Sequence, residues 1–235
     1  MTKFYRYINE RRGDYGKGIS FVDIDETIFH TFAKIHVIDK ETNELIRKLD
    51  NQEFNSYTLK PNEKFDFKEF RDAKLFHDTS IPIKPMVERL KTMIERLKVN
   101  ERGSKIIFLT ARSDFDDKNK FLDTFHKHGI DVSFQPTVYV ERAGNLRTGT
   151  VEQKKEKIIM KYLKKENFRR IRMIDDHMGN IKQFLQIADK IPQNIIDSVK
   201  KEYNIPDGEV VMEFYGLVID PDTGRLSLYD KKEVY

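Results

Sequence analysis

The chain has 235 residues, which is enough to bury a core without disulfides or structural metals. Its 43 basic residues nearly balance its 39 acidic residues, so a disordered polyelectrolyte is excluded. The absence of cysteine excludes disulfides, zinc–thiolate sites and cysteine nucleophiles. No apolar run is long enough for a membrane span, and the N-terminus lacks an apolar signal core, so we expect a cytoplasmic protein.

Four short apolar segments predict buried strands, at residues 19–22, 105–109, 132–140 and 171–174. Runs of this kind are typical of a parallel sheet that is covered on both faces. Amphipathic helices are expected where apolar residues recur every three or four positions, at residues 85–99, 118–128, 151–165 and 181–188. Strands that alternate with helices predict an α/β fold with a doubly wound parallel sheet.

Residues 29–81 break this alternation and predict an insertion between the first strand and the first long helix. Within it, two apolar segments around a turn at 41–44 predict a β-hairpin over 34–49. The insertion also carries a set of aromatic side chains, namely Phe54, Tyr57, Phe65, Phe67, Phe70 and Phe76. They indicate a small core within the insertion or, alternatively, a platform on which nucleic-acid bases stack.

We therefore expect two units. Residues 1–28 and 82–235 would form the α/β core, and residues 29–81 would form a small inserted cap. The tail also departs from the alternation, because apolar residues over 210–219 and 226–229 flank an Asp-Pro-Asp-Thr-Gly turn. This pattern predicts a C-terminal β-hairpin.

Polar residues follow three of the predicted strands directly. They are Asp23, Asp25 and Thr27 after the first strand, Thr110 and Arg112 after the second, and Asp175 and Asp176 after the last. Because ligands of open α/β sheets bind beyond the carboxyl ends of the strands, we expect these side chains to meet. Crowded carboxylates raise one another's pKa values, and a hard divalent cation such as Mg²⁺ relieves their repulsion. Two aspartates one residue apart can divide phosphoryl transfer between a nucleophile and a proton donor.

These motifs resemble the signatures of the haloacid dehalogenase superfamily of phosphohydrolases. The run FVDIDETIF resembles the first signature, DxDxT after an apolar strand, while IIFLTAR resembles the second and MIDD the fourth. The third signature is a lysine that opens a helix. Lys155 fits it best, because apolar residues lie three, four and seven positions further on, and Lys154 is the alternative. The insertion begins where the superfamily places a cap.

Within the superfamily, the chain is distantly similar to the 3′-phosphatase part of phage-type polynucleotide kinases. This likeness rests on the segment PIKPMVERL, on Arg112 and on the order of Arg147, Lys155 and the final acid pair. No GxxxxGK[ST] loop occurs in the sequence, so a kinase half is not expected. Glu26 stands where the superfamily more often has glycine.

The resemblance implies a phosphomonoester hydrolase that acts through an aspartyl-phosphate intermediate. Asp23 would be the nucleophile, and Asp25 would be the general acid and then the general base. Thr110 and Lys155 would hold the transferring phosphoryl group. These roles agree with the physical demands of phosphoryl transfer, which needs positioning and charge neutralisation above all.

The resemblance also implies a magnesium site. Mg²⁺ would be bound by the Asp23 side chain, the Asp25 backbone carbonyl and Asp175, with Asp176 adjacent. Asn180, four residues after Asp176, would either support these acids or face solvent as an ordinary helix residue.

Substrate contacts are expected from Thr27 and Arg112. For Arg112 the alternative is a structural ion pair with a nearby acid, for which the candidates are Asp114, Asp116 and Asp117. His30, at the start of the insertion, is a further candidate for contact with the leaving group.

Positive charge is concentrated between residues 141 and 172, which contain eleven basic and four acidic residues. A basic segment beside the site favours nucleotides or nucleic-acid 3′-phosphate ends as substrates, while a solvated helix face is the alternative explanation. A phosphatase of small metabolites or phosphoproteins is the second candidate. A non-catalytic binding module on the same fold is the third.

Overall fold

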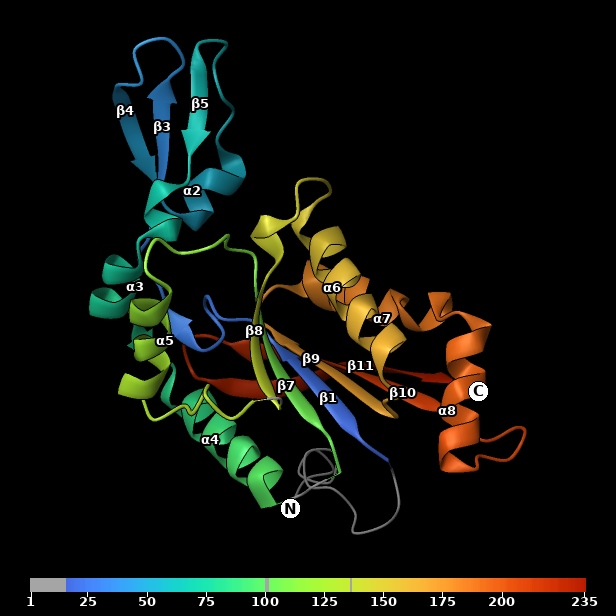
Figure 1. Cartoon of the computed structure of the whole chain (residues 1–235). Helices are drawn as coiled ribbons and strands as arrows, with labels where there is room; N and C mark the ends of the chain where they lie inside the picture. Colours follow the sequence, from blue (N-terminus) through green and yellow to red (C-terminus); the bar gives the residue numbers. More distant parts are fainter. Residues whose placement is uncertain (1–15, 100–101, 136) are drawn as a thin grey trace.

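The computed structural model describes residues 16–99, 102–135 and 137–235, so the N-terminal segment assigned to the core, residues 1–15, lies outside the described residues. At its centre is a six-stranded sheet in the order β11-β10-β9-β1-β7-β8 (Figure 1). The strands of this sheet are β1 (Gly18–Val22), β7 (Lys105–Thr110), β8 (Val138–Arg142), β9 (Arg170–Asp175), β10 (Met212–Asp220) and β11 (Arg225–Val234). All neighbouring pairs are parallel except β10 and β11, so the predicted α/β class with a mostly parallel sheet is confirmed.

Helices cover both faces of the sheet (Figure 1). One face carries α6 (Val151–Lys165), α7 (Met178–Gln186) and α8 (Gln193–Tyr203), and the other carries α3 (Ala73–Thr79), α4 (Lys84–Val99) and α5 (Lys118–Lys127). Successive strand residues point to opposite faces. In β7, Ile107 and Leu109 therefore enter one core while Ile106 and Phe108 enter the other. Burial on both sides explains why these strands are continuous apolar runs in the sequence.

The strand predicted over residues 132–140 begins too early, because β8 starts only at Val138. At the start of the predicted strand, the Asp131 carboxylate instead accepts hydrogen bonds from the backbone and the hydroxyl of Ser133. Such local side-chain bonds compete with strand pairing. Val132 is buried all the same, so its apolar character reports packing rather than strand structure.

The inserted segment forms a second, antiparallel sheet in the order β4-β3-β5 that projects from the central sheet (Figure 1). The predicted hairpin is confirmed as β3 (Ile35–Asp39) and β4 (Leu45–Leu49), and β5 (Glu63–Asp66) is a third strand that was not predicted. The segment also contains two short helices, α2 (Asn51–Ser56) and the 3₁₀ turn η1 (Lys68–Arg71), besides α3, which packs on the central sheet. At its base β2 (Phe29–His30) pairs with β6 (Ile81–Pro82).

Most of the aromatic side chains of the insertion pack into a small core of its own. Phe54, Tyr57, Phe65 and Phe70 pack against Ile35, Val37 and Leu49. Phe76 instead belongs to the core beneath the central sheet, and Phe67 is 44% exposed. The division of the chain into a core and a cap at residues 29 and 81 stays a prediction.

The C-terminal hairpin is confirmed, but its first strand also extends the central sheet, because β10 pairs in parallel with β9. Gly216 of β10 allows α7 to pack closely on this strand, since a Cβ atom there would lie 2.7 Å from the Ile181 side chain of α7. The helix α8 was not predicted. Two 3₁₀ turns, η2 (Ala143–Asn145) and η3 (Ala188–Lys190), complete the elements, and no helix of the described residues is long and apolar enough to span a membrane.

Candidate active site

The carboxyl ends of the three central strands bring the predicted site residues together. Asp23 follows β1 directly, and its backbone N–H donates to the carbonyl of Ile174 in β9 (2.9 Å). Asp175 is the last residue of β9, and Thr110 is the last residue of β7, on the other side of β1. Residues far apart in the sequence therefore meet at one edge of the sheet, as their positions after the strands predict.

A buried lysine joins two of these acids. The Lys155 ammonium donates to Asp23 Oδ1 (2.7 Å) and to Asp175 Oδ2 (2.8 Å), and Lys155 is only 2% exposed. Burial acts to lower the pKa of Lys155, but the charges of Asp175 and Asp23 outweigh it and raise this pKa. Between the two lysines that the sequence left open, the structure therefore places Lys155 against the acids.

The helix α6 directs Lys155 to this position. It begins with a capping box, in which the Thr150 hydroxyl accepts from the backbone of Gln153 and the Gln153 side chain accepts from the backbone of Thr150. Ile158 and Ile159, three and four positions after Lys155, are buried against the sheet on the same side of the helix. The apolar face of α6 therefore carries the lysine into the edge of the sheet.

Asp23, Asp175 and Asp176 form an acidic cluster, with one carboxylate oxygen of each lying within 4.8 Å of the others. Burial raises the pKa of Asp23 well above its ordinary value, although the Lys155 charge opposes this effect. Burial and the charge of Asp175 raise the pKa of Asp176 to about 6. Both directions reflect crowded negative charge in a poorly solvated place, which a hard cation would relieve.

Asp175 is held from the side of α7. The Asn180 amide nitrogen donates to both of its carboxylate oxygens (2.9 and 3.0 Å), and the His177 backbone N–H donates to one of them (2.9 Å). Of the two alternatives for Asn180, the structure therefore favours support of the acids. The other polar atom of this amide, Asn180 Oδ1, is buried and has no hydrogen-bond partner among the described residues.

Asp25 has a different set of partners. Arg112 donates to it through Nε (3.0 and 3.1 Å) and Nη2 (2.6 Å), and the hydroxyls of Thr31 (2.7 Å) and Thr110 (3.3 Å) donate as well. Burial acts to raise the pKa of Asp25, but the Arg112 charge and these hydrogen bonds outweigh it and lower this pKa. The surroundings of Asp25 therefore favour its ionised form.

The predicted alternatives for Arg112 need a correction. Arg112 does form an ion pair with an acid, but the partner is Asp25 rather than Asp114, Asp116 or Asp117. Asp114 instead lies 3.5 Å from Nε of Arg142. The reason is that Arg112 follows the strand beside β1, so its side chain reaches the acid that follows β1. Its expected contact with substrate stays a prediction.

The two threonines of the motifs are fully buried. The Thr27 hydroxyl accepts from the backbone N–H of Asp176 (3.1 Å), which links the loop after β1 to the loop after β9. The Thr110 hydroxyl accepts from the backbone N–H of Arg112 (3.1 Å) while it donates to Asp25. Both hydroxyls therefore fix the geometry of the acids.

Glu26 and Thr31 complete the site and were not predicted as parts of it. Glu26 has a positive φ of 53°, a conformation that glycine adopts without strain, and its carboxylate accepts from the Thr31 backbone (3.0 Å). The same carboxylate lies 2.8 Å from Nδ1 of His30. Glu26 was a visible signal in the sequence, because it departs from the superfamily signature that the motif resembles, whereas Thr31 had none.

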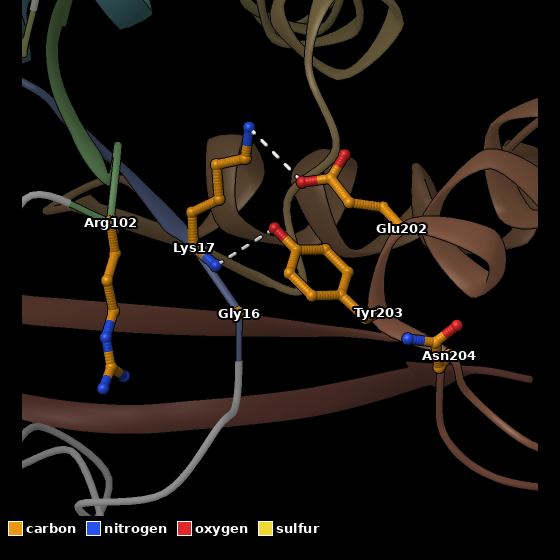
Figure 2. A pocket seen from close by; sticks show the side chains of 6 residues that line it. All are labelled: Gly16, Lys17, Arg102, Glu202, Tyr203 and Asn204. Atoms are coloured by element: carbon orange, nitrogen blue, oxygen red, sulfur yellow. Dashed lines mark hydrogen bonds and ion pairs between the residues drawn. The ribbon is translucent and has the colours of Figure 1, made fainter.

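A cavity of about 500 Å³ lies at the opposite end of the sheet (Figure 2). It is lined by Gly16, Lys17, Arg102, Glu202, Tyr203 and Asn204. Lys17 lies just before β1 whereas Asp23 lies just after it, so roughly 15–20 Å of strand separates the two places. The Lys17 backbone N–H donates to the Tyr203 hydroxyl (3.3 Å), and its ammonium pairs with Glu202 (3.6 Å). The cavity is therefore not an extension of the acidic site.

A scan against models of protein families finds no match to this chain, and a search of curated proteins finds none that is significantly similar.

Proposed function

We propose that the protein is a Mg²⁺-dependent phosphomonoester hydrolase of the haloacid dehalogenase superfamily that acts through an aspartyl-phosphate. The observation that carries the proposal is the buried Asp23–Lys155–Asp175 cluster at the carboxyl end of a parallel sheet. The four motifs that resemble the superfamily signatures supply its members and Asp25 beside it. Binding beyond the carboxyl ends of strands is the general rule for open α/β sheets.

The donor set fits a hard divalent cation. Asp23, Asp175 and Asp176 offer only oxygen atoms, and one carboxylate oxygen of each lies within 4.8 Å of the others. The buried Asn180 oxygen has no hydrogen-bond partner in the part of the chain that the structure describes. Mg²⁺ prefers such oxygens and keeps several waters. These three carboxylates, together with the backbone carbonyl of Asp25, would hold it. When bound, the ion would neutralise negative charge on the phosphoryl oxygens.

The side chains would carry the reaction in two steps. A carboxylate oxygen of Asp23 attacks phosphorus, the bond from phosphorus to the leaving oxygen breaks, and Asp25 protonates that oxygen. Asp25 then takes a proton from a water molecule that attacks the aspartyl-phosphate, which releases inorganic phosphate and restores Asp23. Lys155 and Thr110 would hold the phosphoryl oxygens during both steps.

The surroundings of Asp25 bear on its two roles. Its lowered pKa keeps Asp25 ionised, as the step that accepts a proton from water requires, although it also makes Asp25 a weaker base. The acid role requires Asp25 to take up a proton once substrate is bound, which the negative charge of a nearby phosphate group would favour.

Nucleotides or nucleic-acid 3′-phosphate ends are the proposed substrates of a cytoplasmic enzyme. The helix that carries Lys155 belongs to the basic segment 141–172, which contains eleven basic and four acidic residues. Positive potential of this kind attracts polyanions. Small phosphorylated metabolites and phosphoproteins are the alternative substrates, and a binding module without catalysis is the alternative function.

Turnover of p-nitrophenyl phosphate tests the reaction. We expect the wild-type protein to hydrolyse it with added Mg²⁺ and to lose this activity on treatment with a chelator. Asp23→Asn should reduce turnover by at least ~1,000-fold, because it removes the nucleophile. Folded wild-type protein that shows no turnover across a range of divalent cations would favour the binding module.

A comparison of leaving groups tests the proposed substrate class. The rate of phosphate release from 3′-phosphorylated oligonucleotides is compared with that from nucleoside 3′-monophosphates and from a phosphopeptide. A preference for the oligonucleotide that weakens as salt increases supports a polyanionic substrate. Equal rates, or no release from the oligonucleotide, would contradict it.

A further inference from the structure

The guanidinium of Arg112 is enclosed by aromatic rings. It lies 4.7 Å from the ring centre of Phe70, 5.1 Å from that of Phe76 and 5.6 Å from that of Phe115, and its side chain is 2% exposed. Nη1 donates to the backbone carbonyl of Phe70 (3.2 Å). Aromatic faces attract a cation, most strongly where water is excluded. The orientation of Arg112 is therefore fixed by these rings as well as by Asp25.

Two of the three rings come from the inserted segment. Phe76, on α3, packs edge-on against Phe29 and lies near Phe115 and Phe121, so it belongs to the core beneath the central sheet. Phe70, on η1, packs instead with Phe67 and with the core of the projecting sheet. Phe70 therefore connects the projecting sheet to Arg112, both by its ring and by its carbonyl.

Glu69, the neighbour of Phe70, fastens η1 to the projecting sheet. Its carboxylate accepts from the Lys34 backbone (2.8 Å) and the Lys48 ammonium (2.7 Å), and it lies 2.6 Å from Nε2 of the buried His36. On the other side of η1, the Arg71 carbonyl accepts from the backbone N–H of Asp116 in the core (2.9 Å). The turn η1 is thus held between the two sheets.

From these contacts we infer that the inserted segment positions the Asp25 carboxylate, through Phe70 and Arg112, for proton transfer to the leaving group. The inference rests on the proposed function and gives the insertion a role in positioning Asp25. Phe70 and Arg112 are positioning residues, because they act through Asp25. General acid catalysis depends on the donor lying within hydrogen-bond distance of the leaving oxygen, so a small displacement of Asp25 costs rate.

The leaving group provides a selective test. Phenolate leaves phosphorus less readily than p-nitrophenolate, so phenyl phosphate depends more on protonation by Asp25. In Phe70→Leu we expect the kcat for phenyl phosphate to fall about tenfold further than that for p-nitrophenyl phosphate. This tenfold difference is a small part of the ~100–10,000-fold rate enhancement that a general acid supplies. The KM values should change little, because the phosphoryl contacts are untouched.

Two further variants keep the test decisive. Phe54→Leu removes a ring from the same small core, where Phe54 contacts Phe65 and Phe67 rather than Arg112, and it should leave the ratio of the two rates unchanged. Arg112→Lys keeps the charge but loses the forked contact with Asp25, so it should reproduce the selective loss even if Phe70→Leu does not fold.

The outcomes separate the inference from the proposed function. If the wild-type protein hydrolyses neither ester, the hydrolase proposal fails and this inference falls with it. If the wild-type protein is active but Phe70→Leu and Arg112→Lys slow both esters equally, the inference alone is overturned. A selective loss in both variants, with Phe54→Leu unaffected, supports it.

Discussion

The site has a lysine side and an arginine side, and the chain builds them differently. On the lysine side, Asp23, Asp175 and Lys155 all come from the central sheet and its covering helix α6. On the arginine side, Asp25 is held by Arg112, whose enclosure includes rings of the inserted segment. The comparison indicates that the charge balance around Asp23, the proposed nucleophile, is set by residues of the core, whereas the surroundings of Asp25 include residues of the insertion.

Removal of Lys155 should have the largest effect on stability. Lys155→Met leaves the buried carboxylates of Asp23 and Asp175 without their shared cation, which should lower the free energy of unfolding by about 3–5 kcal/mol. Urea denaturation without divalent cations measures it. Lys154→Met, one position away and outside the cluster, is the matched control and should stay within about 0.5 kcal/mol of wild type. Equal losses would show that the ion pairs of Lys155 do not hold the lysine side together.

Glu69→Gln should loosen the arginine side in a pH-dependent way. Burial acts to raise the pKa of Glu69, but its contacts with Lys48, Lys34 and His36 outweigh burial and lower this pKa from 4.5 to about 2. Because the folded-state pKa lies below the unfolded one, its stabilisation is present above pH 4.5 and is lost as the pH falls toward 2. We expect Glu69→Gln to be about 1.5–3 kcal/mol less stable than wild type at neutral pH.

The difference between wild type and Glu69→Gln should shrink steadily as denaturation is repeated at lower pH. Phosphatase kinetics on the same variant show whether the loss of stability on the arginine side is accompanied by a loss of activity. A loss of stability at neutral pH that persists unchanged at pH 2 would show that the Glu69 charge does not hold η1.

Asp176→Asn should have the smallest effect and the opposite sign. The ionised Asp176 crowds Asp175. Because its folded-state pKa of about 6 lies above the unfolded value of 3.8, this carboxyl destabilises the fold progressively as the pH rises from 3.8 to about 6, and the loss is complete above that. Without divalent cations, the variant should be more stable than wild type at neutral pH by roughly 1 kcal/mol. Added Mg²⁺ should raise the Tm of wild type more than that of the variant. An equal rise in both would exclude Asp176 from the cation site.

Much of the fold was visible in the sequence because the central strands are buried on both faces and are therefore apolar runs. The strand β5 was not, because its residues Glu63–Asp66 have no such run and pair with β3 only once the insertion folds. The helix α8 had a readable signal in Ile195, Ile196 and Val199, which are buried on one side of it.

The lysine side was predictable because its residues stand at strand ends and topology alone brings those ends together. The arginine side was only partly predictable. Arg112 lies 87 positions from Asp25 and 42 positions from Phe70, so its partners depend on how the insertion folds back onto the core. No local pattern in the sequence encodes that arrangement.

The measurement that tests the central claim most directly is the site of covalent phosphorylation. Wild-type protein is mixed with excess p-nitrophenyl phosphate and Mg²⁺, quenched in acid during turnover and digested for mass spectrometry. We expect one phosphoryl group on the peptide that contains Asp23, and none on that peptide in Asp23→Asn. Turnover by the wild-type protein with a phosphoryl group on any other residue, or with no phosphorylated peptide at all, would contradict the role of Asp23.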